Sequence, residues 1–176
     1  MKLIGFTGWS GSGKTVLLTA VLPLLVARGL TVSTVKHAHH GFDLDQPGKD
    51  SWRHRQAGAR EVLIGSGRRW ALMHELSGPE PELPQLLERM APVDLILVEG
   101  FKSNPHPKIE VFRPSLGRAP LWPGRGDIVA IAADGALAAG GAAAGGRPVL
   151  DVNDAAGVAA WLCGFLDMPG AAQHEA

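Results

Sequence analysis

The most constraining feature of this sequence is the segment 8–15, GWSGSGKT, which matches the phosphate-binding pattern G-x-x-x-x-G-K-[ST]. Residues 3–7 before it are apolar and partly β-forming, and residues 16–28 after it carry apolar side chains at helical spacing. Glycines let such a loop curl until successive N–H groups face an anion, and the following helix adds the positive end of its dipole. The segment therefore predicts a strand, a P-loop and a helix that together bind the phosphates of a nucleotide.

Two side chains of this loop have predictable roles. We expect the Lys14 ammonium to reach the β- and γ-phosphates, and the Thr15 hydroxyl to complete the shell of a bound Mg²⁺. The alternative interpretation is a glycine-rich turn that merely joins a strand to a helix. The flanking strand and helix patterns favour the nucleotide site.

The rest of the chain alternates between strand and helix patterns. The predicted strands are 3–7, 31–36, 61–65, 70–74, 93–100, 108–112, 128–132 and 149–151, and the predicted helices are 16–28, 50–59, 81–90 and 154–168. Pro23 should bend or interrupt the first helix. The first strand–helix–strand unit predicts a parallel pair with a right-handed crossover. We predict an α/β, P-loop NTPase-like domain over 1–168, with a mainly parallel sheet flanked by helices and a disordered tail over 169–176.

Charge and cysteine content limit the classes of function. The chain of 176 residues has 17 Lys+Arg and 17 Asp+Glu, so no net charge attracts it to nucleic acid or to an acidic membrane. Its single cysteine, Cys163, excludes an intramolecular disulfide. No secretory segment or membrane-spanning run is recognisable. These features predict a cytoplasmic protein that binds neither nucleic acid nor membrane, with a local anion site.

Acidic residues at strand ends are candidate Mg²⁺ ligands. Glu99 ends the continuous apolar run 93–98, which is typical of a central strand buried on both faces. Ligands of open parallel sheets gather at the carboxyl ends of strands, so we expect Glu99 near the P-loop, where it resembles a Walker B carboxylate. Asp43 and Asp45, in the loop after the strand 31–36, are further candidates. The alternative for Glu99 is an ordinary acidic residue that ends a strand, and the alternative for Asp43 and Asp45 is a polar surface loop.

Basic residues and histidines suggest a second ligand. Lys36, Lys49, Arg53 and their neighbours form a local basic cluster, and Lys102 follows Glu99 closely. They predict either an anion site beside the nucleotide or a solvated surface. The segment 37–40 reads HAHH, and neutral imidazoles bind Zn²⁺ or Ni²⁺, but two paired histidines alone make a weak metal site.

Several stretches together resemble one family. GWSGSGKT at 8–15, VKHAHHGFDLDQPGKDSWRHRQAGA at 35–59, LILVEGFK at 95–102 and PKIEVFR at 107–113 are similar to MobB, the molybdopterin-guanine dinucleotide biosynthesis adaptor family. The resemblance covers most of residues 1–113. It implies binding and slow Mg²⁺-dependent hydrolysis of GTP, and a homodimer. It also implies that the protein assists a guanylyltransferase, which joins GMP to molybdopterin in molybdenum cofactor biosynthesis.

The resemblance also assigns residues. The phosphate site would comprise Gly8, Ser10, Gly11, Ser12, Gly13, Lys14 and Thr15. The metal site would comprise Thr15 and Glu99 with Asp43 or Asp45, and the catalytic group Lys14, Glu99 and Asp45. Independently of the resemblance, the local basic charge predicts that Lys36, Arg53 and Lys102 contact an anionic second ligand, for which the phosphate of molybdopterin is the candidate. The guanine signature N-K-x-D is absent, so a preference for GTP over ATP rests on the resemblance; Asp134 is the one candidate for a base contact.

Two other functions remain open on the residues alone. The histidines favour a nickel or zinc metallochaperone GTPase, whereas Arg113, Arg118 and Arg125 in a long loop favour a small-molecule kinase with a closing lid.

Several large apolar side chains need a surface that buries them. Trp70, Leu72, Phe112 and Trp122 lie in polar surroundings, and a second copy of the chain would cover them.

Overall fold

The computed structural model describes residues 1–38, 41–135, 137 and 144–168. Two compact units make up the chain: Met1–His37 with Ala91–Ala176, and Ala38–Met90. The single domain predicted over 1–168 stays a prediction. The tail 169–176, half of the Ala/Gly-rich stretch 133–146 (residues 136 and 138–143), His39 and His40 lie outside the described residues.

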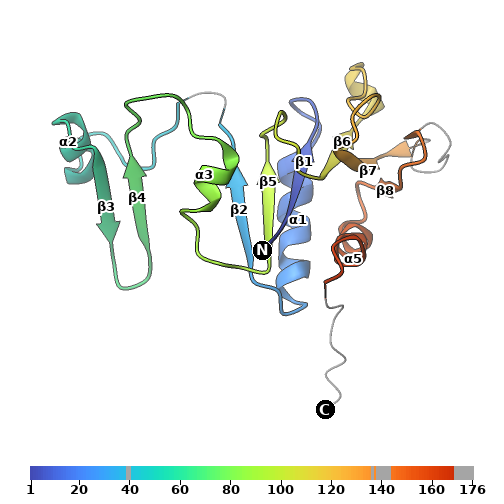
Figure 1. The fold of residues 1–176 in the computed structure, drawn as a ribbon, viewed down its shortest axis with the longest axis horizontal. Helices are drawn as coiled ribbons and strands as arrows, with labels where there is room; N and C mark the ends of the chain where they lie inside the picture. Colours follow the sequence, from blue (N-terminus) through green and yellow to red (C-terminus); the bar gives the residue numbers. More distant parts are fainter. Residues whose placement is uncertain (39–40, 136, 138–143, 169–176) are drawn as a thin grey trace, which may run out of the picture. The chain divides into compact units, whose positions relative to one another are not determined.

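The first unit is built on a six-stranded sheet in which every neighbouring pair is parallel. Its strand order is β2-β5-β1-β6-β7-β8 (Figure 1). The bounds are β1 Lys2–Thr7, β2 Val32–Lys36, β5 Leu95–Glu99, β6 Lys108–Phe112, β7 Ile128–Ala133 and β8 Val149–Asp151, with helices α1 Lys14–Val26 and α5 Ala155–Phe165. The predicted α/β class with a mainly parallel sheet is confirmed.

The order of the first three strands corrects one expectation. β1 and β2 are parallel but do not pair, because β5 lies between them. The residues 95–98 are fully buried, and a strand this apolar is stabilised by covering both its edges as well as both its faces. In this register Glu99 lies level with Phe6 of β1 and Lys36 of β2. The order therefore brings the ends of three strands together at one edge of the sheet.

Helix α1 packs its apolar side on the sheet beside α5. Leu17 and Val21 of α1 share one buried cluster with Ile4 of β1 and Leu162 of α5. Pro23, which was expected to bend or interrupt α1, does not interrupt it: the helix continues to Val26, and Pro23 accepts a hydrogen bond from the Ala27 amide. Pro23 is exposed, so the carbonyl that loses its helical donor can be hydrated.

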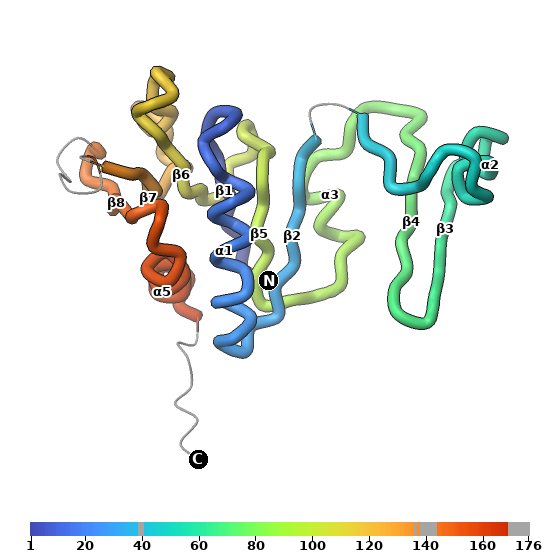
Figure 2. The backbone as a smooth tube through the Cα atoms, turned by 180° about the vertical axis from the view of Figure 1, so that it is seen from behind, coloured from blue at the N-terminus to red at the C-terminus, as the bar shows by residue number. Residues whose placement is uncertain are grey.

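The second unit is a hairpin with two short helices, and Figure 2 shows α2 next to β3. Its elements are α2 Asp50–Gln56, β3 Glu61–Gly65, β4 Trp70–His74 and α3 Leu83–Leu87. The predicted strands 61–65 and 70–74 are present as β3 and β4, and they pair antiparallel, with Leu63 opposite Leu72 and Gly65 opposite Trp70. Both helices are shorter than predicted; α3 has only five residues, from Leu83 to Leu87.

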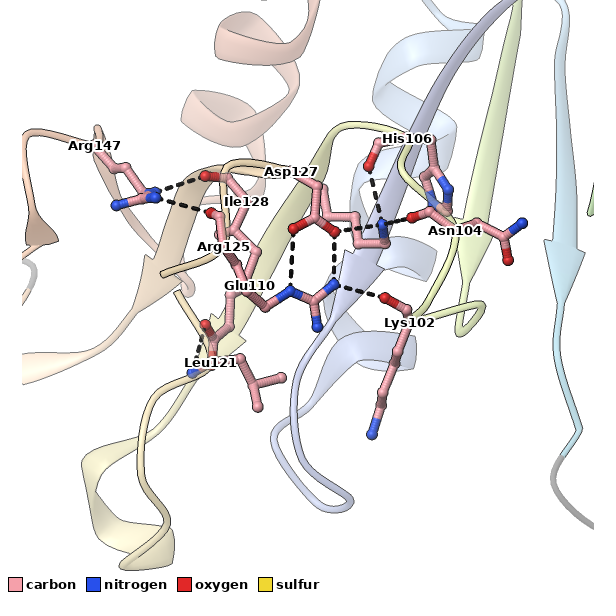
Figure 3. A network of polar contacts seen from close by, with 10 residues as sticks. Lys102, Asn104, His106, Glu110, Leu121, Arg125, Asp127, Ile128 and Arg147 are labelled. Atoms are coloured by element: carbon pink, nitrogen blue, oxygen red, sulfur yellow. Dashed lines mark hydrogen bonds and ion pairs between the residues drawn. The ribbon is translucent and has the colours of Figure 1, made fainter. Parts of the chain in front are cut away.

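A buried polar layer lies on the face of β6 that carries Lys108 and Glu110 (Figure 3). The fully buried Lys108 ammonium forms an ion pair of 2.8 Å with Asp127 and donates to the carbonyl of His106. Arg125 donates to both carboxylate oxygens of Asp127, at 3.1 and 2.6 Å. Glu110 accepts from the Leu121 amide at 2.9 Å. Lys108 and Arg125 thus share the Asp127 carboxylate, and Glu110, whose pKa is raised by burial, is held by a backbone amide, so each of the four side chains has a partner.

His106, at the edge of this layer, makes stability depend on pH. Burial, reinforced by the charge of Lys108, lowers the pKa of His106 from 6.5 to about 4. The folded state therefore keeps His106 neutral between these values while the unfolded state binds a proton. We expect the free energy of unfolding to fall by up to about 3 kcal/mol as the pH is lowered from 7 to 4. Denaturant unfolding of the parent and of His106→Gln should show a flatter decline in the variant over that window.

Candidate functional site

The P-loop takes the backbone shape that its glycines allow. Gly8, Gly11 and Gly13 have φ angles of 138°, 81° and 93°, in a region that other residues rarely adopt. At Gly8 there is also no space, because a Cβ would lie 2.4 Å from the Val111 carbonyl oxygen. The loop is therefore packed directly against the end of β6 and leads into α1 at Lys14. Ser12 lies buried in its wall.

Lys14 reaches back over the loop. Its ammonium donates to the carbonyl oxygens of Gly8 at 3.1 Å and Trp9 at 2.8 Å. Burial lowers the pKa of Lys14; Glu99 opposes this shift, while the positive charges of Lys102 and Lys36 add to it. An anion that binds among these lysines would stabilise the charged form of Lys14, because it offsets the repulsion from its like-charged neighbours.

Thr15 and Glu99 meet at the predicted metal position. The Thr15 hydroxyl donates to Glu99 Oε1 at 2.7 Å, and Lys36 Nζ lies 3.8 Å from Glu99 Oε2. The structure thus brings Glu99 to the P-loop, as the strand pattern predicted. A hydroxyl and a carboxylate are oxygen donors of the kind that Mg²⁺ prefers, and they suit a hydrated ion held by few protein ligands. These residues fit Mg²⁺.

Trp9 connects the P-loop to the chain beyond β6. Its indole N–H donates to the Ala119 carbonyl at 2.7 Å. Lys102 Nζ lies 5.6 Å and the Arg118 guanidinium 5.7 Å from the centre of its ring, within the range of cation–π attraction. The structure therefore places Lys102 beside the loop, and it also brings Arg118 there.

Arg113 and Asp134 form a contact that the sequence analysis missed. Arg113 donates from Nε to the Ser12 carbonyl at 3.1 Å and forms an ion pair with Asp134. Asp134 is thus bound to an arginine, and Arg125 is engaged by Asp127 and the Lys102 carbonyl. Of the three arginines assigned to a lid, two therefore hold the fold together. No local pattern reveals such pairs, because their partners lie far apart in the sequence.

The remaining predicted residues lie in the second unit. Arg55 Nη2 lies 2.8 Å from a carboxylate oxygen of Asp43 and 2.8 Å from one of Asp45, and the Asp45 side chain is buried. The hydrogen bond to Asp45 raises the pKa of Arg55. Arg53 is exposed on α2. The metal roles of Asp43 and Asp45 and the anion role of Arg53 stay predictions.

Across 1–38, 41–135, 137 and 144–168, no group of three or more His, Cys, Asp or Glu side chains is arranged to hold a metal ion. Within the same ranges, no helix has the length and hydropathy needed to span a membrane.

Comparison with known proteins gives a consistent family. The model of the family "Molybdopterin guanine dinucleotide synthesis protein B", MobB, matches residues 3–134. A molybdopterin-guanine dinucleotide biosynthesis adapter protein of Escherichia coli K12 is 43% identical over 171 residues, 94% of each chain. One of Haemophilus influenzae is 46% identical over 118 residues, 66% of each chain. A crystal structure of MobB is 26% identical, with a TM-score of 0.70, over 93% of this chain and 99% of that one.

Proposed function

The chain belongs to the MobB family, and from that premise we propose that it binds GTP with Mg²⁺ and acts as the adapter of a guanylyltransferase in molybdopterin guanine dinucleotide biosynthesis. The observation that supports nucleotide binding is the convergence of Lys14, Thr15 and Glu99. The first two are the last residues of the P-loop motif and the first of α1, and Glu99 ends β5, the strand next to β1. This geometry supports a phosphate cradle at the loop and, beside it, an oxygen-donor metal site where Thr15 and Glu99 are hydrogen-bonded.

Each group has one task in this proposal. The loop amides and Lys14 hold the β- and γ-phosphates. Thr15 and Glu99 orient Mg²⁺, which when bound neutralises charge on the phosphates. In this proposal Lys14 and Glu99 of the first unit support slow hydrolysis, and Asp45, the third catalytic residue predicted from the sequence, is paired with Arg55 within the second unit.

A second anionic ligand, the phosphate of molybdopterin, would use the lysines around Glu99. Lys36 and Lys102 both act electrostatically on Lys14, so positive charge gathers around Lys14. Arg53 is the third group assigned to this ligand. An exposed guanidinium on α2 is free of the packing constraints that a buried one has, and it suits a phosphate that arrives with a partner enzyme.

Titration calorimetry tests the proposal directly. The protein should bind GTP more tightly than ATP, and Mg²⁺ should strengthen the binding. A pull-down from cells grown with molybdate should recover a guanylyltransferase, with bound pterin detected by its fluorescence after oxidation. Binding of neither nucleotide would overturn the proposal, and equal binding of both would remove its guanine preference.

We also propose that the protein is a homodimer through its hairpin. Leu63, Trp70 and Leu72 lie on one face of β3 and β4, with exposed fractions of 64%, 69% and 46%. Phe112 and Trp122, by contrast, pack edge to face at a centroid distance of 5.0 Å in the protein's own core and need no partner. A continuous apolar face of this kind favours self-association.

The hairpin face gives a mutational prediction. Trp70→Glu should convert a dimer at micromolar concentration into a monomer, because it places a charge within the apolar contact. Sedimentation velocity measures the change. Val26→Glu, which alters an exposed apolar residue of α1, serves as the control and should stay dimeric. A parent protein that sediments as a monomer would contradict the proposal.

A further inference from the structure

Arg113 contacts the P-loop from outside the predicted phosphate set. It follows β6 and lies 101 positions from Ser12, yet its Nε donates to the Ser12 carbonyl at 3.1 Å. A Cβ on Gly13 would lie 3.7 Å from both Nε and Nη2 of the same guanidinium. The other side of the guanidinium is paired with Asp134, which follows β7. Arg113 therefore links the P-loop to the ends of two neighbouring strands.

The bond to Ser12 fixes the direction of the next amide. The peptide between Ser12 and Gly13 is trans, since no cis peptide bond occurs among the described residues, and in a trans peptide the carbonyl and the following N–H point in opposite directions. Because the Ser12 carbonyl points to Arg113, the Gly13 N–H points away from it. Gly13, with φ of 93°, is a residue whose conformational freedom would otherwise let this peptide rotate.

We propose that Arg113 is a positioning residue of the phosphate site, which turns the Gly13 N–H towards the bound phosphate by holding the Ser12 carbonyl, and that Asp134 orients Arg113 for this task. The inference rests on the proposed nucleotide binding. The substrate group concerned is the diphosphate that the loop would enclose. In this scheme the guanidinium acts through Nε, which holds Ser12, and Nη1, which is held by Asp134, and its effect on phosphate binding runs through the orientation of the loop.

If Arg113 acted on phosphate through its charge alone, the effect of Asp134 would have the opposite sign. A guanidinium near the loop attracts phosphate, and the adjacent Asp134 carboxylate weakens that attraction. Removal of the carboxylate charge would then strengthen anion binding. If orientation is what matters, the same change loosens the Arg113 side chain and weakens anion binding. Asp134→Asn therefore separates positioning from simple attraction by the sign of its effect.

The experiment is a calorimetric titration of the full chain with GDP and, separately, with inorganic pyrophosphate. Arg113→Lys retains the charge but not the planar fork, and should weaken both ligands about tenfold. Asp134→Asn should also weaken the binding of both GDP and pyrophosphate. Arg113→Ala combined with Asp134→Asn should be no weaker than Arg113→Ala alone, because the two side chains act through one bond.

A spectroscopic readout distinguishes positioning from a folding defect. In ¹H–¹⁵N spectra, Arg113→Lys should shift the Gly13 amide signal and reduce its response to pyrophosphate. The matched control is Arg147→Lys, since Arg147 also donates to carbonyls, of Ile128 at 2.6 Å and of Arg125 at 2.9 Å. This control should lower thermal stability without changing pyrophosphate affinity or the Gly13 signal.

Three outcomes would overturn the inference. Parent-like affinity in Arg113→Lys, or tighter binding in Asp134→Asn, would show that orientation by the guanidinium is not needed. An unchanged Gly13 signal in a weakened variant would show the same. These results differ from failure of the proposed function, in which the parent itself binds neither GDP nor pyrophosphate.

Discussion

Lys14→Ala should weaken GTP binding at least about a hundredfold while leaving the protein folded. The ammonium bridges the carbonyls of Gly8 and Trp9, so it lies over the loop where the phosphates would bind. Its removal deletes charge-assisted hydrogen bonds to two phosphates. The glycines keep their φ angles, because the loop is packed against Val111 and not held up by Lys14 alone.

The measurement is a calorimetric titration with GTP and Mg²⁺, accompanied by circular dichroism to confirm the fold. Arg68→Ala, which alters an exposed residue of the hairpin turn, is the control and should bind GTP like the parent. Equal affinity in Lys14→Ala and the parent would show that segment 8–15 is only a structural turn.

Glu99→Gln should have the second largest effect, and it should weaken the binding of Mg²⁺ and not the binding of the nucleotide itself. Glutamine can still accept the hydrogen bond that Thr15 donates at 2.7 Å, so the local geometry survives. The lost negative charge weakens Mg²⁺ binding, and we expect the Mg²⁺-dependent hydrolysis rate to fall at least about tenfold. Without Mg²⁺, affinity for GTP should not fall, because a carboxylate beside phosphates repels them.

Phosphate release at saturating GTP, and GTP titrations with Mg²⁺ or EDTA, separate the two effects. Asp151→Asn provides a control at the end of another strand, where the carboxylate accepts hydrogen bonds from Asn153. If Glu99→Gln lost Mg²⁺-free binding and hydrolysis to the same extent, Glu99 would be a structural residue and Mg²⁺ would be held elsewhere.

The features that the sequence determined by itself are local ones. A P-loop needs glycines at fixed positions followed by a lysine and a hydroxyl residue, and these contacts span only a few residues. The strands and helices of the first unit were likewise predictable, because burial on one or both faces leaves a periodic pattern. The run 93–98 even identified β5 as a central strand, and Glu99 as a residue at the same edge as the P-loop.

Only the tertiary structure decided which distant segments meet. The insertion of β5 between β1 and β2, the pairing of Lys108 with Asp127, and the bond from Arg113 to Ser12 join residues that no periodicity connects. Such contacts depend on the order of strands in the sheet. That order is selected by the burial of whole strands, to which many residues contribute and which no short motif records.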